Sequence, residues 1–186
     1  MHVVAVTNAA EVQAAVLAAR ERRLPLSVYA TGHGTIVQND GGVQINTSAM
    51  AEVLVDPDRR VAHVGPGARW AQVLTAAAPF GLAPLSGSSP SVGVTGYTLG
   101  GGMGPLGRRH GFAADHVRRL RLVTADGRPH EIDADRAPEL FWALRGAVPP
   151  SATSAKPVSR KSPASAGPAT SHSSRSARSA SGRGPA

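Results

Sequence analysis

Residues 29–35 (YATGHGT) present a single histidine between two glycines, and we call this stretch the first glycine loop. A neutral imidazole nitrogen is a nucleophile near physiological pH. Glycines leave backbone N–H groups uncovered, so that successive amides can converge on an anion such as a diphosphate. Taken alone, the heptapeptide fits better with a strand-ending turn that carries an incidental histidine. The residues of the candidate cradle are Ala30, Thr31, Gly32, His33, Gly34 and Thr35.

A second stretch, residues 87–117, is richer in glycine, and we call its residues 87–107 the second glycine loop. It contains neither a dinucleotide fingerprint directly after a strand nor a P-loop. A flexible linker rarely carries apolar residues between its glycines, as this stretch does with Val92, Tyr97 and Leu99. Apolar side chains between closely approaching glycines suit a wall against which a large flat ligand lies. The pair of loops therefore favours a cofactor site.

Other residue types exclude several chemistries. The chain has no cysteine, which rules out disulfides, thiolate metal sites and a cysteine nucleophile. Its seven histidines show no metal-binding spacing, so we expect no metal site. The arginines at 118, 119 and 121 could contact phosphates, but the outer face of a strand explains them better. Phe141, Trp142 and Leu144 are interpreted as core residues at helical spacing.

The elements that must position the loops mix helices with antiparallel hairpins. Asn8 and Glu11 form a capping-box pattern that predicts a helix of about three turns after residue 8. Strands are predicted at residues 24–30, 42–48 and, around a turn, 51–67. A helix is predicted over 68–81, a hairpin with its turn at 125–127, and a short helix over 137–146. The class is therefore α+β rather than a doubly wound sheet.

Charge separates a folded region, residues 1–146, from a tail, residues 147–186. The first region has 14 Arg, no Lys and 12 acidic residues, whereas the tail has two Lys, four Arg and no acid. The tail also holds 11 Ser and six Pro and no aromatic residue, so it buries too little apolar surface to offset the entropy of ordering. We expect it to be disordered. No apolar run reaches the roughly 18 residues of a membrane helix, and the default expectation is a cytoplasmic protein.

Residues 3–146, and above all the long glycine motif, resemble the PCMH-type FAD-binding domain of the vanillyl-alcohol oxidase and p-cresol methylhydroxylase superfamily, with the berberine-bridge-enzyme-like oxidases as the nearest branch. The resemblance implies two small α/β subdomains, FAD as cofactor and oxidation of a small organic substrate by hydride transfer to the flavin. It also implies that His33 bonds covalently to the C8 methyl carbon of the flavin, while residues 30–35 hold the diphosphate. The residues implied to line the flavin, its ribityl chain and the adenine are Gly87, Ser88, Val92, Gly93, Gly96, Tyr97, Gly101, Gly102 and Val117.

The chain departs from this family pattern in three places. Ser89 stands where members with a second covalent link have cysteine, so His33 is expected to be the single attachment point. Tyr29 stands where many relatives have arginine, so we expect backbone amides to bind the diphosphate. After Gly146 the family pattern stops, and we expect a frameshift or truncation between Gly146 and Ser151 that removes the substrate domain with its catalytic base.

Two interpretations without catalysis stay open. The first is an inactive truncated product, because a domain without its covering partner exposes apolar surface and an unpaired sheet edge. The second is a non-enzymatic protein whose six basic tail charges bind an anionic partner by counterion release. Because the tail lacks aromatic residues for base stacking, we expect no specific nucleic-acid partner, and we expect no membrane partner. The sequence gives no prediction of oligomeric state.

Overall fold

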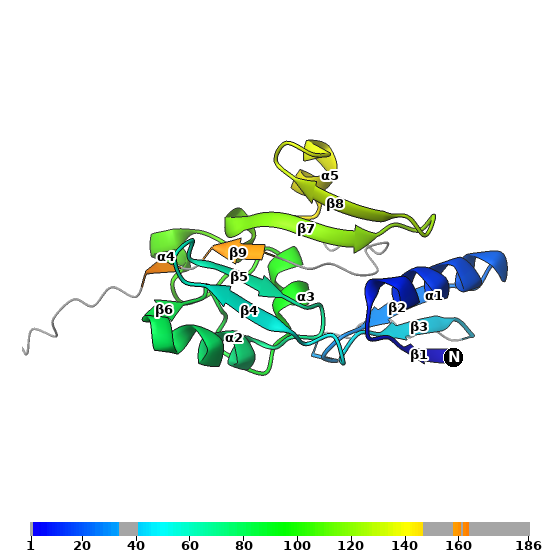
Figure 1. The fold of residues 1–186 in the computed structure, drawn as a ribbon, viewed down its shortest axis with the longest axis horizontal. Coiled ribbons are helices and arrows are strands. Elements are labelled where there is room, and N and C mark those ends of the chain that lie inside the picture. The colour runs from blue at the N-terminus through cyan, green and yellow to red at the C-terminus, as the bar shows by residue number, and fades with distance from the viewer. Residues whose placement is uncertain (1, 34–40, 147–157, 161, 164–186) are drawn as a thin grey trace, which may run out of the picture.

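A computed structural model describes residues 2–33, 41–146, 158–160 and 162–163 (Figure 1). Within these ranges, none of the helices combines the length and the apolar character needed to cross a membrane. The described residues form two main sheets with helices packed on them, one parallel and one antiparallel. This arrangement confirms the predicted α+β class.

The N-terminal part is a three-stranded parallel sheet with one helix. Its elements are β1 (His2–Ala5), α1 (Ala9–Glu21), β2 (Leu26–Tyr29) and β3 (Val43–Asn46), in the sheet order β1-β3-β2. As predicted, α1 begins after Asn8, whose side chain accepts a hydrogen bond from the backbone N–H of Glu11 at 3.0 Å. The Glu11 carboxylate in turn accepts from the backbone N–H of Thr7 at 2.7 Å. These reciprocal bonds satisfy N–H groups at the helix start that have no partner inside the helix.

The larger part is built on a five-stranded antiparallel sheet in the order β4-β5-β9-β7-β8. Its strands are β4 (Val53–Asp56), β5 (Val61–Val64), β7 (Val117–Val123), β8 (Pro129–Asp133) and β9 (Val158–Arg160). The remaining elements are α2 (Trp70–Ala77), η1 (Ala78–Phe80), β6 (Leu82–Ala83), α3 (Val94–Leu99), α4 (Gly107–His110), η2 (Ala113–His116), α5 (Pro138–Ala143) and β10 (Ser162–Pro163). The predicted strands at 51–67, the helix ending at Gly81 and the hairpin turn at 125–127 all occur.

Two short strands fall inside the tail that the composition predicts to be disordered. β9 pairs with both β5 and β7, and β10 pairs with β6. These five residues hydrogen-bond to strand edges, where an extended segment can satisfy an open row of backbone groups without apolar side chains. The disorder of the tail as a whole stays a prediction. The rest of the tail lies outside the described residues.

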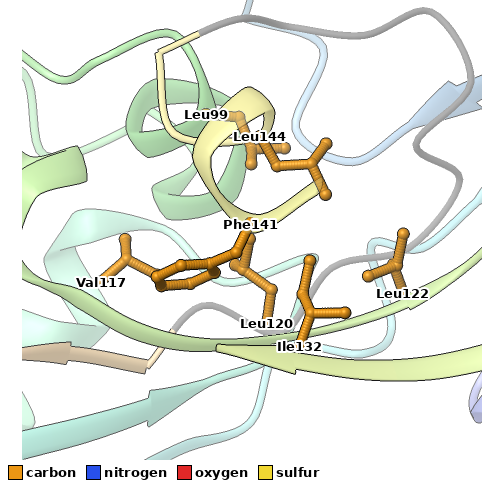
Figure 2. Close-up of a cluster of buried hydrophobic side chains, with 7 residues drawn as sticks. All are labelled: Leu99, Val117, Leu120, Leu122, Ile132, Phe141 and Leu144. Atoms are coloured by element: carbon orange, nitrogen blue, oxygen red, sulfur yellow. The ribbon is translucent and has the colours of Figure 1, made fainter. Parts of the chain in front are cut away.

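The hairpin β7–β8 carries the core that connects the glycine loops to the C-terminal helix. Figure 2 shows side chains from the hairpin, from the end of α3 and from the segment 141–144 packed together. The cluster consists of Leu99, Val117, Leu120, Leu122, Ile132, Phe141 and Leu144. Trp142 is not part of it: the side chain is 75% exposed, contrary to the prediction. Adjacent helical residues point about 100° apart, so Phe141 and Trp142 cannot both face the same core.

The structure adds elements that the sequence patterns do not indicate. Two short helices, α3 and α4, lie inside the glycine-rich stretch 86–107 and just beyond it, where only a loop is predicted. The N-terminal strands pair in parallel, so a small parallel sheet accompanies the antiparallel one. The end of the hairpin contacts α1, where the side-chain amide of Gln13 donates to the backbone carbonyl of Gly127 at 3.0 Å. The hairpin therefore joins the two sheets (Figure 1).

Candidate cofactor-binding site

The first glycine loop leaves the carboxyl end of β2, an edge strand of the parallel sheet. The Tyr29 carbonyl accepts hydrogen bonds from the backbone N–H of Thr47 at 2.8 Å and from its hydroxyl at 3.3 Å, which fixes the point where the loop begins. Gly32 has φ +73°, a conformation that residues with a side chain rarely adopt, and the exposed His33 follows it. Ligands commonly bind beyond the carboxyl ends of parallel strands. Gly34 and Thr35 lie outside the described residues.

The second glycine loop is fixed by backbone bonds to the segment that precedes α2. The N–H of Trp70 donates to the carbonyl of Val92 at 3.0 Å, and the N–H of Val94 donates to the carbonyl of Ala68 at 3.0 Å. Gly93 ends this ladder and caps α3, whose residues Val94, Thr95, Thr98 and Leu99 are buried. The loop is therefore part of the folded core rather than a linker.

Tyr97 on α3 explains why several positions of this loop are glycine. A Cβ on Gly102 would lie 2.7 Å from the Tyr97 ring and 2.6 Å from the Cβ of Ala113, and a Cβ on Gly87 would lie 3.0 Å from the ring. Trp70 packs edge-on against the same ring at a centroid distance of 5.4 Å. The ring of Tyr97 therefore occupies the space that side chains at these glycines would fill.

The two loops meet in the structure. Thr31 of the first loop packs on Gly93 of the second, so closely that a Cβ on Gly93 would lie 2.9 Å from the hydroxyl and the methyl group of Thr31. Two of the predicted site residues, far apart in sequence, are therefore neighbours. The two loops are therefore in contact at Thr31 and Gly93, as a shared cofactor site requires.

The polar atoms around α3 fit a polar ligand. Among the described residues, the hydroxyls of Thr95, Tyr97 and Thr98 are buried without a hydrogen-bond partner. Burial also raises the pKa of the Tyr97 hydroxyl, so it stays protonated and able to donate. Buried polar groups are nearly always paired, so these three hydroxyls are available as hydrogen-bonding partners for a bound molecule or for water. This feature, together with the close glycines, fits a flavin cofactor.

The remaining predicted residues are placed less uniformly. Ser88 and Gly96 are exposed, Gly101 and Val92 are half-buried, and Val92 packs against the cluster around Trp70. Val117 is a core residue beside Leu120 and Phe141 (Figure 2). The hydroxyl of Ser89 pairs with that of Ser91 at 2.9 Å.

Two arginines of the hairpin, considered above as phosphate ligands, have a structural role instead. Arg119 and Arg121 form ion pairs with Glu131 across the hairpin, at 3.1 and 2.7 Å, which confirms their place on the outer face of a strand. Within the described ranges, no cluster of histidine and acidic residues could hold a metal ion.

Sequence reasoning missed three residues of this site: Arg69, Thr95 and Thr98. The guanidinium of Arg69 hydrogen-bonds to both glycine loops. A signal for Arg69 was present, because a cation directly before a helix is electrostatically unfavourable and implies another partner. The two threonines gave no such signal, since only the tertiary structure shows that they are buried.

Comparisons with known proteins agree with this geometry. Residues 1–133 match the family model described as "FAD binding domain". The chain is 37% identical over 144 residues to (R)-6-hydroxynicotine oxidase of Paenarthrobacter nicotinovorans, covering 76% of this chain and 31% of that protein. It is 36% identical over 141 residues to xylooligosaccharide oxidase of Thermothelomyces thermophilus, covering 73% and 28%. The structure of BBE-like 1 from Physcomitrella patens superposes with a TM-score of 0.80 at 26% identity, covering 86% of this chain and 36% of that one.

The chain thus spans about a third of the length of the curated relatives it matches. The match covers both glycine loops and the strands and helices that hold them. The relatives named above are oxidases, and the superposed structure is a berberine-bridge-enzyme-like protein. The chain therefore belongs to the FAD binding domain family, and FAD is its cofactor.

Proposed function

We propose that this chain binds FAD between its two glycine loops and forms the flavin-carrying part of an oxidoreductase. The contact between Thr31 and Gly93 is the observation that carries this proposal, because it brings the two predicted halves of the site together. The backbone amides of residues 30–35 bind the diphosphate. The second glycine loop and the buried hydroxyls of Thr95, Tyr97 and Thr98 contact the flavin and its ribityl chain.

His33 attaches the cofactor covalently in this proposal. It is exposed, and it follows a glycine whose positive φ turns the chain at this point. An imidazole nitrogen of His33 would hold the flavin through a bond to its C8 methyl carbon. This attachment would release one proton from the methyl group and one from the imidazole, and the two electrons would pass to an acceptor such as dioxygen. The hydroxyl of Ser89 cannot form a second link, since that chemistry needs a thiolate.

The substrate is a small organic molecule or an oligosaccharide. This proposal rests on two relatives, one named as an oxidase of 6-hydroxynicotine and the other as an oxidase of xylooligosaccharides. Bound FAD supplies the ability to accept a hydride from a substrate C–H bond. This chain's own residues contribute by fixing the cofactor and by shielding one side of it with the second loop and Tyr97.

Acid precipitation tests the proposal directly. The full chain is incubated with FAD and precipitated with acid, and the pellet is inspected for yellow colour. Peptide mass spectrometry then places the adduct: we expect the mass of one FAD on the peptide that contains His33. The His33→Ala variant should lose this adduct while still binding FAD reversibly. Covalent flavin in the His33→Ala variant would contradict the assignment of the attachment site.

A further inference from the structure

Arg69 lies immediately before α2, and its side chain reaches both glycine loops. Its Nη1 donates to the backbone carbonyl of Ser91 in the second loop at 2.5 Å, and its Nη2 donates to the backbone carbonyl of Thr31 in the first loop at 3.3 Å. The backbone of Arg69 also forms an antiparallel bridge with Gly93. One residue thus hydrogen-bonds to both sides of the contact between Thr31 and Gly93.

The position of Arg69 is not explained by the helix that follows it. A cation at the N-terminal end of a helix is disfavoured by the helix dipole. The backbone N–H of Arg69 is already satisfied by the side-chain carbonyl of Gln72 at 2.8 Å, and this bond does not depend on the side chain at position 69. The guanidinium therefore contributes through its contacts with the loops.

The geometry of the guanidinium suits two acceptors on separate segments. Its N–H groups project in a rigid planar fork, whereas a lysine ammonium is a single point that cannot reach two carbonyls in the same way. The positive charge of Arg69 adds to this role, because the two loops it contacts, residues 29–33 and 87–107, contain no Asp, Glu, Lys or Arg of their own. The backbone of Thr31 belongs to the part of the first loop proposed to bind the diphosphate.

We propose that Arg69 is a positioning residue that sets the spacing between the diphosphate-binding loop and the flavin-binding loop. This inference rests on the proposed function, because it takes the two loops as the two ends of one FAD site. A ligand that contacts both loops depends on their spacing, whereas a ligand that contacts only one does not. Loss of the Arg69 guanidinium should therefore weaken the binding of FAD more than the binding of riboflavin, which has no phosphate.

Reversible binding measured in the His33→Ala background tests this inference. FAD and riboflavin are titrated into the full chain, and binding is followed by quenching of flavin fluorescence. We expect Arg69→Gln and Arg69→Lys each to weaken FAD binding about tenfold or more, the loss expected for one charge-assisted hydrogen bond. Riboflavin binding should change less than about threefold. Arg59→Gln is the matched control, because Arg59 is an exposed arginine whose described ion pair is with Asp56.

Thermal unfolding without ligand separates positioning from stability. A purely structural role would weaken both ligands equally and follow the loss of stability. Should Arg69→Gln fail to fold, Arg69→Lys carries the test because it keeps the charge and most of the side-chain volume. Full FAD affinity in Arg69→Lys, or equal losses for FAD and riboflavin, would overturn the inference and leave the proposed function intact. A parent chain that binds neither ligand would overturn both.

Discussion

The two glycine loops differ in what holds their shape. The second loop is bonded through its backbone to the segment before α2, and its glycines pack against Tyr97, Ala113 and the carbonyl of Ser86. The first loop begins at a well-anchored strand end but then runs over the surface, where Gly32 and His33 are exposed. Its described contacts beyond that point are Thr31 on Gly93 and the hydrogen bond from Arg69.

In the proposed FAD site, this difference separates a closely packed wall, the second loop, from a more exposed segment, the first loop. A wall for a flat ring must be fixed before the ligand arrives, because repacking a core costs free energy. A loop that binds a diphosphate through backbone amides needs exposed N–H groups, and these groups cannot be buried without a ligand. Substitutions should therefore affect folding strongly in the second loop and affect ligand contacts mainly in the first.

Gly104→Ala should give the largest effect. The new Cβ would lie 2.2 Å from the backbone carbonyl oxygen of Ser86 and 2.9 Å from the Tyr97 hydroxyl, so that the backbone itself must move. We expect the free energy of unfolding to fall by about 3 kcal/mol or more, measured by urea denaturation. Gly96→Ala is the control, since no atom lies within 4 Å of the position its methyl group would take and alanine favours the helix. Equal stabilities of the two variants would show that the second loop is not a rigid wall.

Gly93→Ala should have an intermediate effect on stability. Its Cβ would meet side-chain atoms of Thr31 at 2.9 Å, and a side chain can rotate away where a backbone cannot. We expect a loss of about 1–2 kcal/mol in urea denaturation. The double variant Gly93→Ala/Thr31→Ala should recover much of this loss, because it removes the two atoms that clash. Additive losses in this double-mutant cycle would mean that the loops do not meet at this pair.

Gly32→Ala should cost less, about 1 kcal/mol, although its φ is +73°. The added Cβ would lie 2.7 Å from the hydroxyl of Tyr29, the end of a side chain that can move on the surface. Binding should respond more than folding does, because the loop amides near Gly32 would change direction. Urea denaturation and FAD titration of the same variant measure the two effects. A stability loss as large as that of Gly104→Ala would remove the contrast between the loops.

Acidification should give the smallest effect and leave the contrast between the loops unchanged. The hydrogen bond from Arg121 lowers the pKa of Glu131 below its ordinary value of 4.5, and the charges of Arg119 and Arg136 lower it further. A lowered pKa stabilises the fold above the unfolded-state value, and this contribution disappears as the pH falls through the folded-state value. We expect the thermal midpoint to decrease slightly between about pH 5 and pH 3. Glu131→Gln should reduce this decrease. If the thermal midpoint of the variant falls with pH as steeply as that of the wild type, the decrease comes from other carboxylates.

The local pattern of the sequence was enough to predict most helices and strands. The cap at Asn8, the stop at Gly81 and the turn at 125–127 are decided by interactions within a few residues, so they could be predicted. The helices α3 and α4 could not be predicted, because a run of glycines has low helix propensity. The start of α3 is fixed by a distant segment, through the bond from the N–H of Val94 to the carbonyl of Ala68. The strand β9 also depends on distant partners, the open edges of β5 and β7.

For the site, the sequence determined which residue types are present, and its resemblance to a known family implied FAD as the cofactor. Glycine spacing and one histidine between glycines are local properties, and they identify the two loops by type. Only the tertiary structure decided that Thr31 lies on Gly93, that Arg69 hydrogen-bonds to both loops and that Val117 belongs to the core. The physical reason is that contacts between segments about 20 to 60 residues apart depend on how the sheets pack, and no local pattern encodes that packing.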